Sequence, residues 1–336
     1  QGQAPLIMGY DMAPGTGQDI DNAYPSNSQL GYKGVVFGNF NQADAADEIV
    51  VDFGTIGLWY YDNGNWTQIS GLNPDSIVGG VTFTTTDEEI VADFGATGLW
   101  YWNGESTWFQ MSGLNATGMF FVDDDDDGTD DLHVDFGATG LWRVDFSGSF
   151  SLSNWIQLSG VNPGAGLMVD FWVAGFPEAV WTFGTLGMWN IYISAGSPYY
   201  TQLTGTASYE DDFASGNFTA ATGAKDLVAD FASIGLWLYK GASPNGWYQI
   251  SSMSANRVKE VKFVGGSQDD ELLAEDNAGG LYWGNWNGST FVWELITNDD
   301  IGPSLAWCET FDKDGTDSND QEVAIPWTAG GASIYD

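Results

Sequence analysis

The sequence has little of several residue types on which many enzymes depend. Its 336 residues include one cysteine, one histidine and eight Lys and Arg residues together. A single cysteine excludes an intrachain disulfide and a cysteine-based zinc cluster, and a single histidine removes the usual participant in metal and triad chemistry. The scarcity of these groups argues against most metal-dependent and nucleophilic enzymes.

Positive charge is also scarce, because 46 Asp and Glu residues give a formal net charge of -38. Such a chain repels phosphate backbones and anionic lipid surfaces, so we expect no nucleic-acid partner. No run of about 18 apolar residues is present, so we expect no membrane insertion. Hydrophobic residues make up 43% of the chain and aromatic residues 15%, which is enough material for a core and argues against disorder.

An eight-residue motif with a Phe-Gly turn recurs along the chain, for example DFGATGLW at 93–100. Successive copies lie 41 to 51 residues apart, and the last two copies are degenerate. Repetition at this period is typical of arrays of small supersecondary units. The seven copies are 52–59, 93–100, 135–142, 182–189, 230–237, 275–282 and 326–333.

The residues around each copy predict four short strands per repeat. An acidic residue precedes the motif, an apolar run follows that residue, and a glycine recurs inside the motif, as in a β-hairpin. An aromatic–x–Gln–apolar segment and a further apolar run supply two more strands, and no helical periodicity is found. The acidic positions are Glu48, Glu89, Asp131, Glu178, Asp226, Glu271 and Glu322.

Repeats of four strands and this length predict an all-β, seven-bladed β-propeller with four-stranded blades. The last repeat stops at Asp336 before its aromatic–x–Gln segment, and Ser28-Gln29-Leu30 resembles the missing strand. We therefore expect the ring of 24–336 to be closed by an N-terminal strand that completes the last blade. The expected blades are 34–78, 79–118, 119–166, 167–208, 209–258, 259–303 and 304–336 with 24–33.

Residues 1–23 remain outside the predicted ring. They either lie along its surface as a tail or form an arm that binds a neighbouring copy of the chain. The sequence begins at Gln1 without an initiator Met, as a processed secreted protein or a trimmed tag would. Together with the low Lys and Arg content, this favours an extracellular or cell-surface location.

An aspartate-rich loop in the third repeat is a candidate calcium site. Residues 123–132 read DDDDDGTDDL, in which alternating carboxylates can converge on one hard cation. The alternative is a solvated acidic loop without a metal. The expected Ca²⁺ ligands are Asp123, Asp125, Asp127, the Thr129 carbonyl and Asp131.

A second candidate calcium loop precedes the seventh motif, at Asp312, Asp314 and Asp317. Its spacing to the following acidic residue is longer than in the third repeat.

Four tryptophans recur at the aromatic–x–Gln position and are candidate sugar-binding side chains, although packing on the flanks of the blades is the simpler interpretation. They are Trp66, Trp108, Trp155 and Trp247.

Other conspicuous side chains are expected to be structural. His133 and Cys308 both lie in apolar strands and are expected to be buried. The tryptophans of the motif itself continue an apolar strand in every copy and are expected in the core. They are Trp59, Trp100, Trp142, Trp189 and Trp237.

The calcium loop, the apolar strand and the Phe-Gly turn together resemble the FG-GAP/VCBS-type repeat, which occurs in integrin-like propellers and in Psathyrella-type seven-bladed lectins. The repeat pattern covers nearly all of 34–336, but only the third repeat has the full calcium motif. The resemblance implies calcium in the outer loops and, in the lectin members, sugar pockets between or on the blades. Fold similarity alone does not establish function.

We therefore expect a secreted, calcium-binding module without enzymatic activity that recognises glycans or a cell-surface partner. The alternative is a structural subunit of an extracellular filament, sheath or surface layer, with contacts through the ring faces and residues 1–23. A glycosidase needs a pair of carboxylates, which 46 acidic residues supply by chance. A sialidase-like site needs an arginine cluster, and the chain has only Arg143 and Arg257.

Overall fold

The computed structural model describes 34–41, 48–82, 88–104, 107–146, 154–171, 177–206, 213–219, 224–241, 246–261, 270–297, 310–311, 322–326 and 332–335. The chain divides into two compact units, and each is described by itself. The first covers Leu30–Met168 and Phe176–Gly205, and the second covers Gln1–Gln29, Val169–Gly175 and Thr206–Asp336.

The unit containing Leu30–Met168 has four antiparallel sheets of four strands each. Only Val169, the last residue of one of these strands, is assigned to the other unit. Within each sheet, strands pair in the order in which they occur in the sequence. Sheet 1 has β1 (Gly34–Gly38), β2 (Glu48–Asp52), β3 (Leu58–Asp62) and β4 (Asn65–Ser70). Sheet 2 has β5 (Ser76–Val81), β6 (Glu88–Asp93), β7 (Leu99–Trp102) and β8 (Trp108–Ser112). Sheet 3 has β9 (Gly118–Val122), β10 (Asp131–Asp135), β11 (Leu141–Val144) and β12 (Trp155–Ser159), and sheet 4 has β13 (Gly166–Val169), β14 (Glu178–Thr182), β15 (Met188–Ser194) and β16 (Ser197–Thr204).

The other unit contains two more four-stranded sheets and one sheet with three described strands. Sheet 5 has β17 (Phe213–Gly216), β18 (Asp226–Asp230), β19 (Leu236–Lys240) and β20 (Gly246–Ser251). Sheet 6 has β21 (Ala255–Val261), β22 (Glu271–Asp276), β23 (Leu281–Trp286) and β24 (Phe291–Thr297). Sheet 7 has β25 (Thr310–Phe311), β26 (Glu322–Pro326) and β27 (Ala332–Tyr335).

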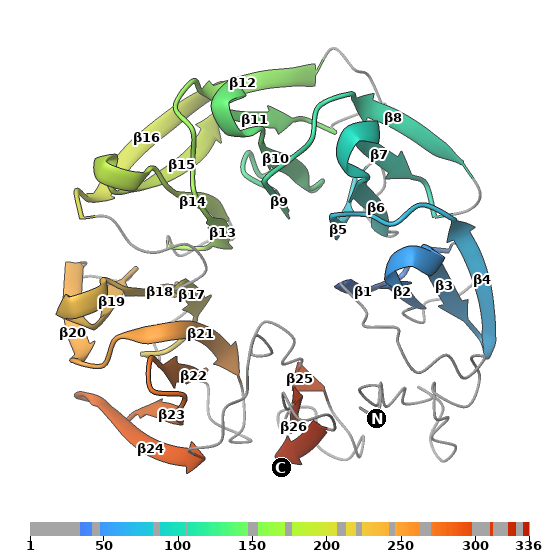
Figure 1. The fold of residues 1–336 in the computed structure, drawn as a ribbon. Coiled ribbons are helices and arrows are strands. Elements are labelled where there is room, and N and C mark those ends of the chain that lie inside the picture. Colours follow the sequence, from blue (N-terminus) through green and yellow to red (C-terminus); the bar gives the residue numbers. More distant parts are fainter. Residues whose placement is uncertain are drawn as a thin grey trace. The chain divides into compact units, whose positions relative to one another are not determined.

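Sheets 1, 2 and 3 contact each other through their first strands, and so do sheets 5 and 6. β5 touches both β1 and β9, and β17 touches β21. In the unit with sheets 1 to 3, the first strands gather on one side and β4, β8 and β12 lie on the opposite side (Figure 1). The second strands of sheets 3, 4 and 5 (β10, β14 and β18) are buried along their whole length, which explains their continuous apolar runs.

The Phe-Gly motif forms a short 3-10 turn between the second and third strands, where a simple hairpin turn was expected. Each turn is followed by a glycine in a conformation that L side chains avoid; Gly98 has φ 85° and ψ -166°, and a Cβ there would lie 2.1 Å from the Ser112 carbonyl oxygen. The recurring Gln holds the turn, since Gln110 Nε2 donates to Thr97 O at 2.9 Å. The turns are η1 (Gly54–Ile56), η2 (Gly95–Thr97), η3 (Gly137–Thr139), η5 (Gly184–Leu186) and η6 (Ala232–Ile234).

The motif tryptophans lie at the edge of the core, and Trp100, Trp142 and Trp189 pack against its buried residues. Their side chains are partly buried, and four of them donate the indole N–H to the 3-10 turn, as Trp100 does to Thr97 O at 3.1 Å. The indole is amphipathic, so a position that buries the ring edge and satisfies the N–H is favourable. The partly buried residues are Trp59, Trp100, Trp142, Trp189 and Trp237.

The all-β prediction and the four-stranded repeat are confirmed for six sheets. The strand expected at Ser28–Leu30, the 1–23 arm and Cys308 lie outside the described residues. Ring closure therefore stays a prediction. Within the part of the chain that the structure describes, no helix is long and apolar enough to cross a membrane.

Candidate functional sites

The acidic loop of the third repeat connects β9 to β10 and folds back on its first aspartate. The Asp123 carboxylate accepts the backbone N–H groups of Asp127 and Gly128, both at 3.1 Å. Asp126 and Gly128 have positive φ angles of 58° and 88°, which the tight turn requires. The loop thus brings alternate side chains to the same side of the backbone.

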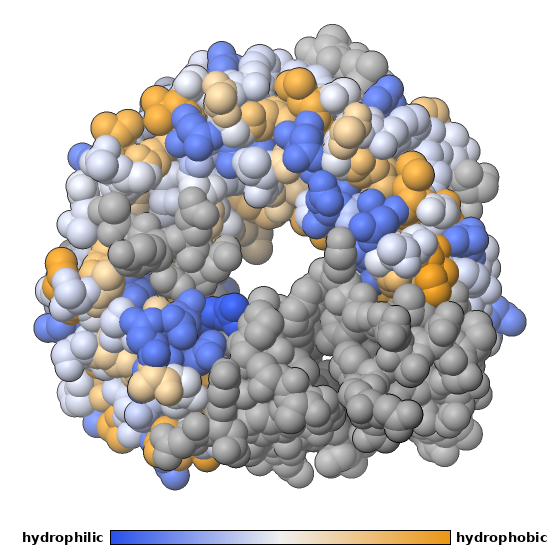
Figure 2. All heavy atoms as spheres, viewed as in Figure 1, coloured by the Kyte–Doolittle hydropathy of each residue, from blue (hydrophilic) through white to orange (hydrophobic). Residues whose placement is uncertain are grey.

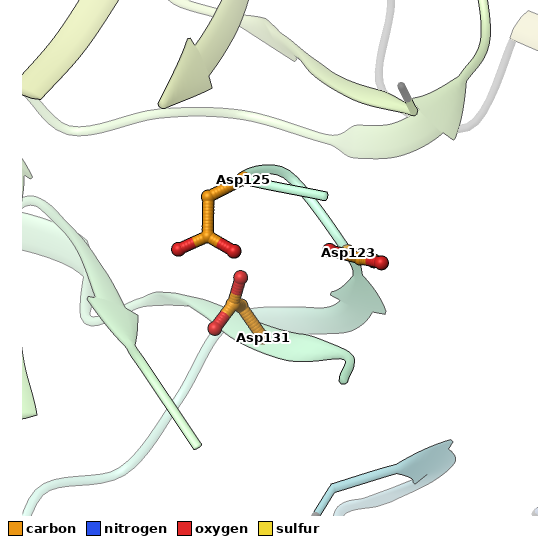
Figure 3. A group of neighbouring side chains, drawn as sticks. All are labelled: Asp123, Asp125 and Asp131. Atoms are coloured by element: carbon orange, nitrogen blue, oxygen red, sulfur yellow. The ribbon is translucent and has the colours of Figure 1, made fainter. Parts of the chain in front are cut away.

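Three of the five predicted ligands lie together. Carboxylate oxygens of Asp123, Asp125 and Asp131 lie within 4.8 Å of one another, and Figure 3 shows the Asp125 and Asp131 carboxylates facing each other. Asp127 is instead bonded to Thr129, whose backbone N–H and hydroxyl donate to its Oδ1 at 2.9 and 2.5 Å. The second predicted loop, with Asp312, Asp314 and Asp317, lies outside the described residues.

A buried arginine neutralises much of this acidic cluster. Arg143, on β11, is 1% exposed, and its guanidinium donates to Asp124 Oδ1 and to Asp125 Oδ2, both at 2.7 Å. It also forms an ion pair with Asp131, and its Nη1 lies 3.4 Å from Asp145 Oδ2. A buried arginine in contact with several carboxylates offsets the repulsion among them.

His133 is completely buried beside the same cluster, as expected for a structural histidine. Its Nε2 lies 2.7 Å from Asp124 Oδ2, and its Nδ1 accepts the Trp181 indole N–H at 3.2 Å. Because Nδ1 is an acceptor, Nε2 carries the hydrogen that is donated to Asp124. His133 thus joins the acidic cluster to Trp181 of sheet 4, on which Phe120 of sheet 3 stacks.

Burial and charge shift the carboxyl groups of the loop in different directions. Desolvation raises the pKa of Asp123, Asp125 and Asp131, although the charge of Arg143 opposes the rise at Asp125 and Asp131. At Asp124, desolvation is outweighed by the hydrogen bond from His133 and by the charge of Arg143, so its pKa is lowered. Asp124 is therefore the anionic partner of the two basic side chains.

The carboxylate oxygens of this group that accept no hydrogen bond suit a hard cation. Asp125 Oδ1 and Asp131 Oδ1 are buried and accept no hydrogen bond. Buried oxygens without a partner are unfavourable unless a donor or a cation reaches them. Oxygen-only ligands of this kind suit Ca²⁺.

Sequence reasoning missed the part played by Arg143 and Asp124. The sequence does contain a signal at the third position after the motif glycine. This position is Tyr60 in the first repeat and Tyr101 in the second, but Arg143 in the third. In the first two repeats, these tyrosine hydroxyls contact Asn41 and Thr82, which are bonded to the acidic residue of that repeat. An arginine at this position indicates a larger group of acids to be neutralised.

The tryptophans proposed as sugar ligands lie on the last strand of each sheet and are partly buried. Trp108 donates its indole N–H to Ile69 O of the preceding sheet at 2.9 Å and packs against Phe94, with ring centroids 5.5 Å apart. Tyr200 Oη reaches Leu158 O in the same way at 2.7 Å. These aromatic side chains thus connect neighbouring sheets. The same packing on a motif Phe occurs at Trp66, Trp155 and Trp247.

An open pocket of about 480 Å³ lies beside sheet 6, in the unit that contains Thr206–Asp336. One wall is the loop between β20 and β21, and the other is the turn after β22 together with side chains of β23 and β24. Two aromatic and several polar side chains thus share one hollow, as in many small-molecule sites. Its lining residues are Ser251, Ser252, Met253, Ser254, Asp276, Asn277, Ala278, Tyr282 and Trp293.

The pocket walls are held by hydrogen bonds between backbone and side chains. Asp276 Oδ1 accepts the N–H groups of Ala278 and Gly280, both at 2.8 Å, which fixes the turn. Asn277 Nδ2 donates to Ser254 Oγ at 2.9 Å and so links the two walls. The pocket is therefore largely preformed.

Comparisons with known proteins identify the type of fold. No protein-family description matches the sequence, and no characterised protein matches it at a significant level. Among solved structures, the β-propeller lectin BP39L from Burkholderia pseudomallei has a TM-score of 0.61 and 13% identity, over 89% of this chain and 94% of that chain. BBS1N in complex with ARL6DN has a TM-score of 0.58 and 10% identity, over 99% and 97% of the two chains.

A third structure, Sqt1 from Saccharomyces cerevisiae, has a TM-score of 0.57 and 11% identity, over 86% of this chain and 80% of that chain. At these identities the likeness concerns the fold, not the activity. The chain has an all-β fold of the propeller type, with six four-stranded antiparallel sheets among the described residues.

Proposed function

We propose that this protein is a carbohydrate-binding module that acts by recognition, without enzymatic turnover, on a glycan or a glycan-bearing cell-surface partner. The observation that supports this most strongly is the pocket at sheet 6, where Trp293 and Tyr282 lie beside the Asp276 carboxylate. Sugar rings present C–H groups that pack on aromatic faces and hydroxyl groups that donate to carboxylates. The lectin similar in fold is consistent with this use of the architecture.

A glycan array tests the proposal directly. The wild-type protein is expected to bind a defined subset of glycans, with competition by the free sugar, and Trp293→Ala is expected to lose that binding. Glu294→Gln is a suitable control, because Glu294 is the exposed neighbour of Trp293 on β24 and does not line the pocket. Binding to no glycan, or equal binding by Trp293→Ala, would contradict the proposal.

The acidic loop of sheet 3 is proposed as a structural Ca²⁺ site. Asp123, Asp125 and Asp131 would hold the ion, which would supply positive charge to the two oxygens that accept no hydrogen bond. Calorimetric titration with CaCl₂ is expected to show binding that Asp125→Asn weakens and that Asp62→Asn, on sheet 1, leaves unchanged. Equal heats for all three proteins would rule out this site.

The remaining sequence expectations are proposed on the same footing. Six complete four-stranded sheets are consistent with seven blades closed by residues 24–33 and with FG-GAP/VCBS-type repeats. The net charge of -38 is consistent with an extracellular or cell-surface location. Residues 1–23 are proposed as a tail or as an arm for a second copy.

A structural subunit of an extracellular assembly is the second candidate function. It is favoured by apolar side chains that recur after the outer strands, where Leu72, Leu114 and Val161 are 51%, 48% and 46% exposed. However, apolar side chains on the visible described surface form separate spots between polar ones (Figure 2). Separate spots do not make a broad adhesive patch. Negative-stain images of native material with and without chelator separate the two candidates, because ordered polymers would support assembly and single particles would support the binding module.

A further inference from the structure

We infer that the pocket at sheet 6 is a site for a neutral saccharide, and that it was opened by the replacement of two aromatic residues that cover the equivalent tryptophan in other repeats. The inference rests on the proposed glycan-binding function and names its ligand class and its specificity-determining residues, Trp293 and Asp276. It depends on a comparison of sheet 6 with the other sheets of the same chain.

In sheets 1, 2 and 5, the outer-strand tryptophan is packed between two rings. Trp66 packs against Phe53 of the motif, with ring centroids 5.6 Å apart, and against Tyr61 of β3 at 4.9 Å. The same arrangement surrounds Trp108 in sheet 2, with partners at 5.5 and 6.3 Å, and Trp247 in sheet 5, with partners at 5.1 and 5.3 Å. A tryptophan packed in this way has both ring faces or edges in contact with other side chains and contributes to the core.

Sheet 6 lacks both of these rings. The strand register places Trp293 opposite Gly284, where Trp66 lies opposite Tyr61 in sheet 1. The motif Phe is replaced by Asp276, which lines the pocket with Trp293. A Cβ at Gly284 would lie 2.6 Å from Trp293 Cζ3, so the glycine allows the indole to lie against the backbone of β23.

Trp293 nevertheless stays fixed in this opened position. Its indole N–H donates to Ile250 O at 3.1 Å, and its ring stacks on Phe291 with centroids 5.7 Å apart. A ring held before binding loses little rotational freedom when a ligand packs on it. The two replacements thus change a structural tryptophan into a preorganised binding surface.

Asp276 supplies the polar half of the site. Its Oδ1 is occupied by the two backbone N–H groups of the turn, and none of the described residues donates to its Oδ2. A carboxylate oxygen is an acceptor only, so it selects hydroxyl or amide donors. The hydroxyl groups of Ser252 and Ser254 line the same hollow, next to the Tyr282 ring.

These groups favour an uncharged sugar ring. A pyranose can place a C–H face on Trp293 and a hydroxyl donor at Asp276, and a pocket of about 480 Å³ lies within the usual range for small-molecule sites. No cationic side chain lines the pocket, and the charge at its wall is that of the Asp276 carboxylate, because the adjacent Glu275 is paired with Arg257. A carboxylated or sulfated sugar would be repelled by this field.

Matched pairs of ligands test the selectivity. Methyl glucoside and methyl galactoside are titrated calorimetrically against the corresponding methyl glucuronide and methyl galacturonide, and methyl N-acetylglucosaminide is included as a further neutral probe. At least one neutral glycoside is expected to bind at least about tenfold more tightly than any uronide. Tighter binding of a uronide, or equal binding, would overturn the inference while leaving a glycan-binding function intact.

Variants of Asp276 and Trp293 locate the site. Asp276→Asn keeps an Oδ1 acceptor for the turn and is expected to weaken the neutral glycoside about tenfold or more, because a charged acceptor is lost. Asp276→Phe restores the motif residue and is expected to abolish binding by covering Trp293, whereas Glu294→Gln is expected to bind like wild type. Circular dichroism and urea unfolding confirm that each variant is folded.

The outcomes separate the two levels of the proposal. Glycan binding that persists in Asp276→Phe and Trp293→Ala places the site elsewhere and refutes this inference alone. An absence of binding to every glycan of the array and to every glycoside refutes both the inference and the proposed function.

Discussion

Replacement of Arg143 by Met should destabilise the protein much more than the same change at Arg257. Arg143 is 1% exposed and contacts the carboxylates of Asp124, Asp125 and Asp131. Met removes the cation and leaves these buried acids uncompensated, a change that costs about 3–5 kcal/mol when one partner of a buried pair is lost. Arg257 is 28% exposed and lies 3.7 Å from its carboxylate partner, so its loss should cost about 1 kcal/mol or less.

Urea unfolding in EDTA, followed by far-ultraviolet circular dichroism, measures both free energies. The chelator removes divalent cations that could replace the lost guanidinium. A subsequent titration with CaCl₂ should restore part of the loss in Arg143→Met, because the ion would supply charge to the same carboxylates. Equal destabilisation by the two substitutions would show that Arg143 does not neutralise the loop.

Three further outcomes follow from the structure. Gly98→Ala should lower the free energy of unfolding by more than about 1 kcal/mol, because the residue has a φ of 85° and an added Cβ would lie 2.1 Å from a carbonyl oxygen. A urea midpoint equal to that of the wild type would contradict this. Trp108→Ala should cost about 1 kcal/mol more stability than Trp293→Ala, because Trp108 contacts two rings and Trp293 contacts one. Comparable urea curves would refute the claim that Trp293 is packed by fewer aromatic rings. Burial raises the pKa of Asp93 and Asp230, so the folded chain binds protons more tightly than the unfolded chain at these positions. The free energy of unfolding should therefore increase as the pH falls from 7 towards about 4. A decrease over that range would show that other groups dominate.

The repeat architecture could be predicted from the sequence because its signal is redundant. Seven copies of the motif fixed the positions of the strands, and six complete sheets have the expected order. The turn type was not predicted, because a Phe-Gly hairpin and a 3-10 turn share the same glycine requirement at Gly57 or Gly98. The partial burial of Trp59 and its equivalents does not follow from the sequence, because an apolar run does not show which of its side chains reach the surface of the sheet.

The acidic loop could be recognised from the spacing of its aspartates, but the arginine that neutralises it could not. Arg143 lies more than ten positions from the loop in sequence, and only the pairing of β10 with β11 brings it next to Asp131. Asp127 is not part of the group of three carboxylates, and its Oδ1 instead accepts the N–H and hydroxyl of Thr129. Contacts of this kind depend on side-chain packing, which spacing alone does not determine.

The pocket illustrates the opposite case, in which a departure from the pattern carries information. The sixth motif has Asp276 where the first five copies have Phe, and Gly284 where Tyr61 or Trp102 stand in earlier repeats. Either change alone looks like degeneration of the repeat. The strand register shows that both changes surround one tryptophan, and this could be seen only once the strands were aligned.

Saturation-transfer difference NMR with a neutral methyl hexoside tests the central claim most directly. The account predicts strong transfer to the ring C–H protons of one face of the sugar, its loss in Trp293→Ala and Asp276→Phe, and its persistence in Glu294→Gln. Undiminished transfer in Trp293→Ala and Asp276→Phe would contradict the account.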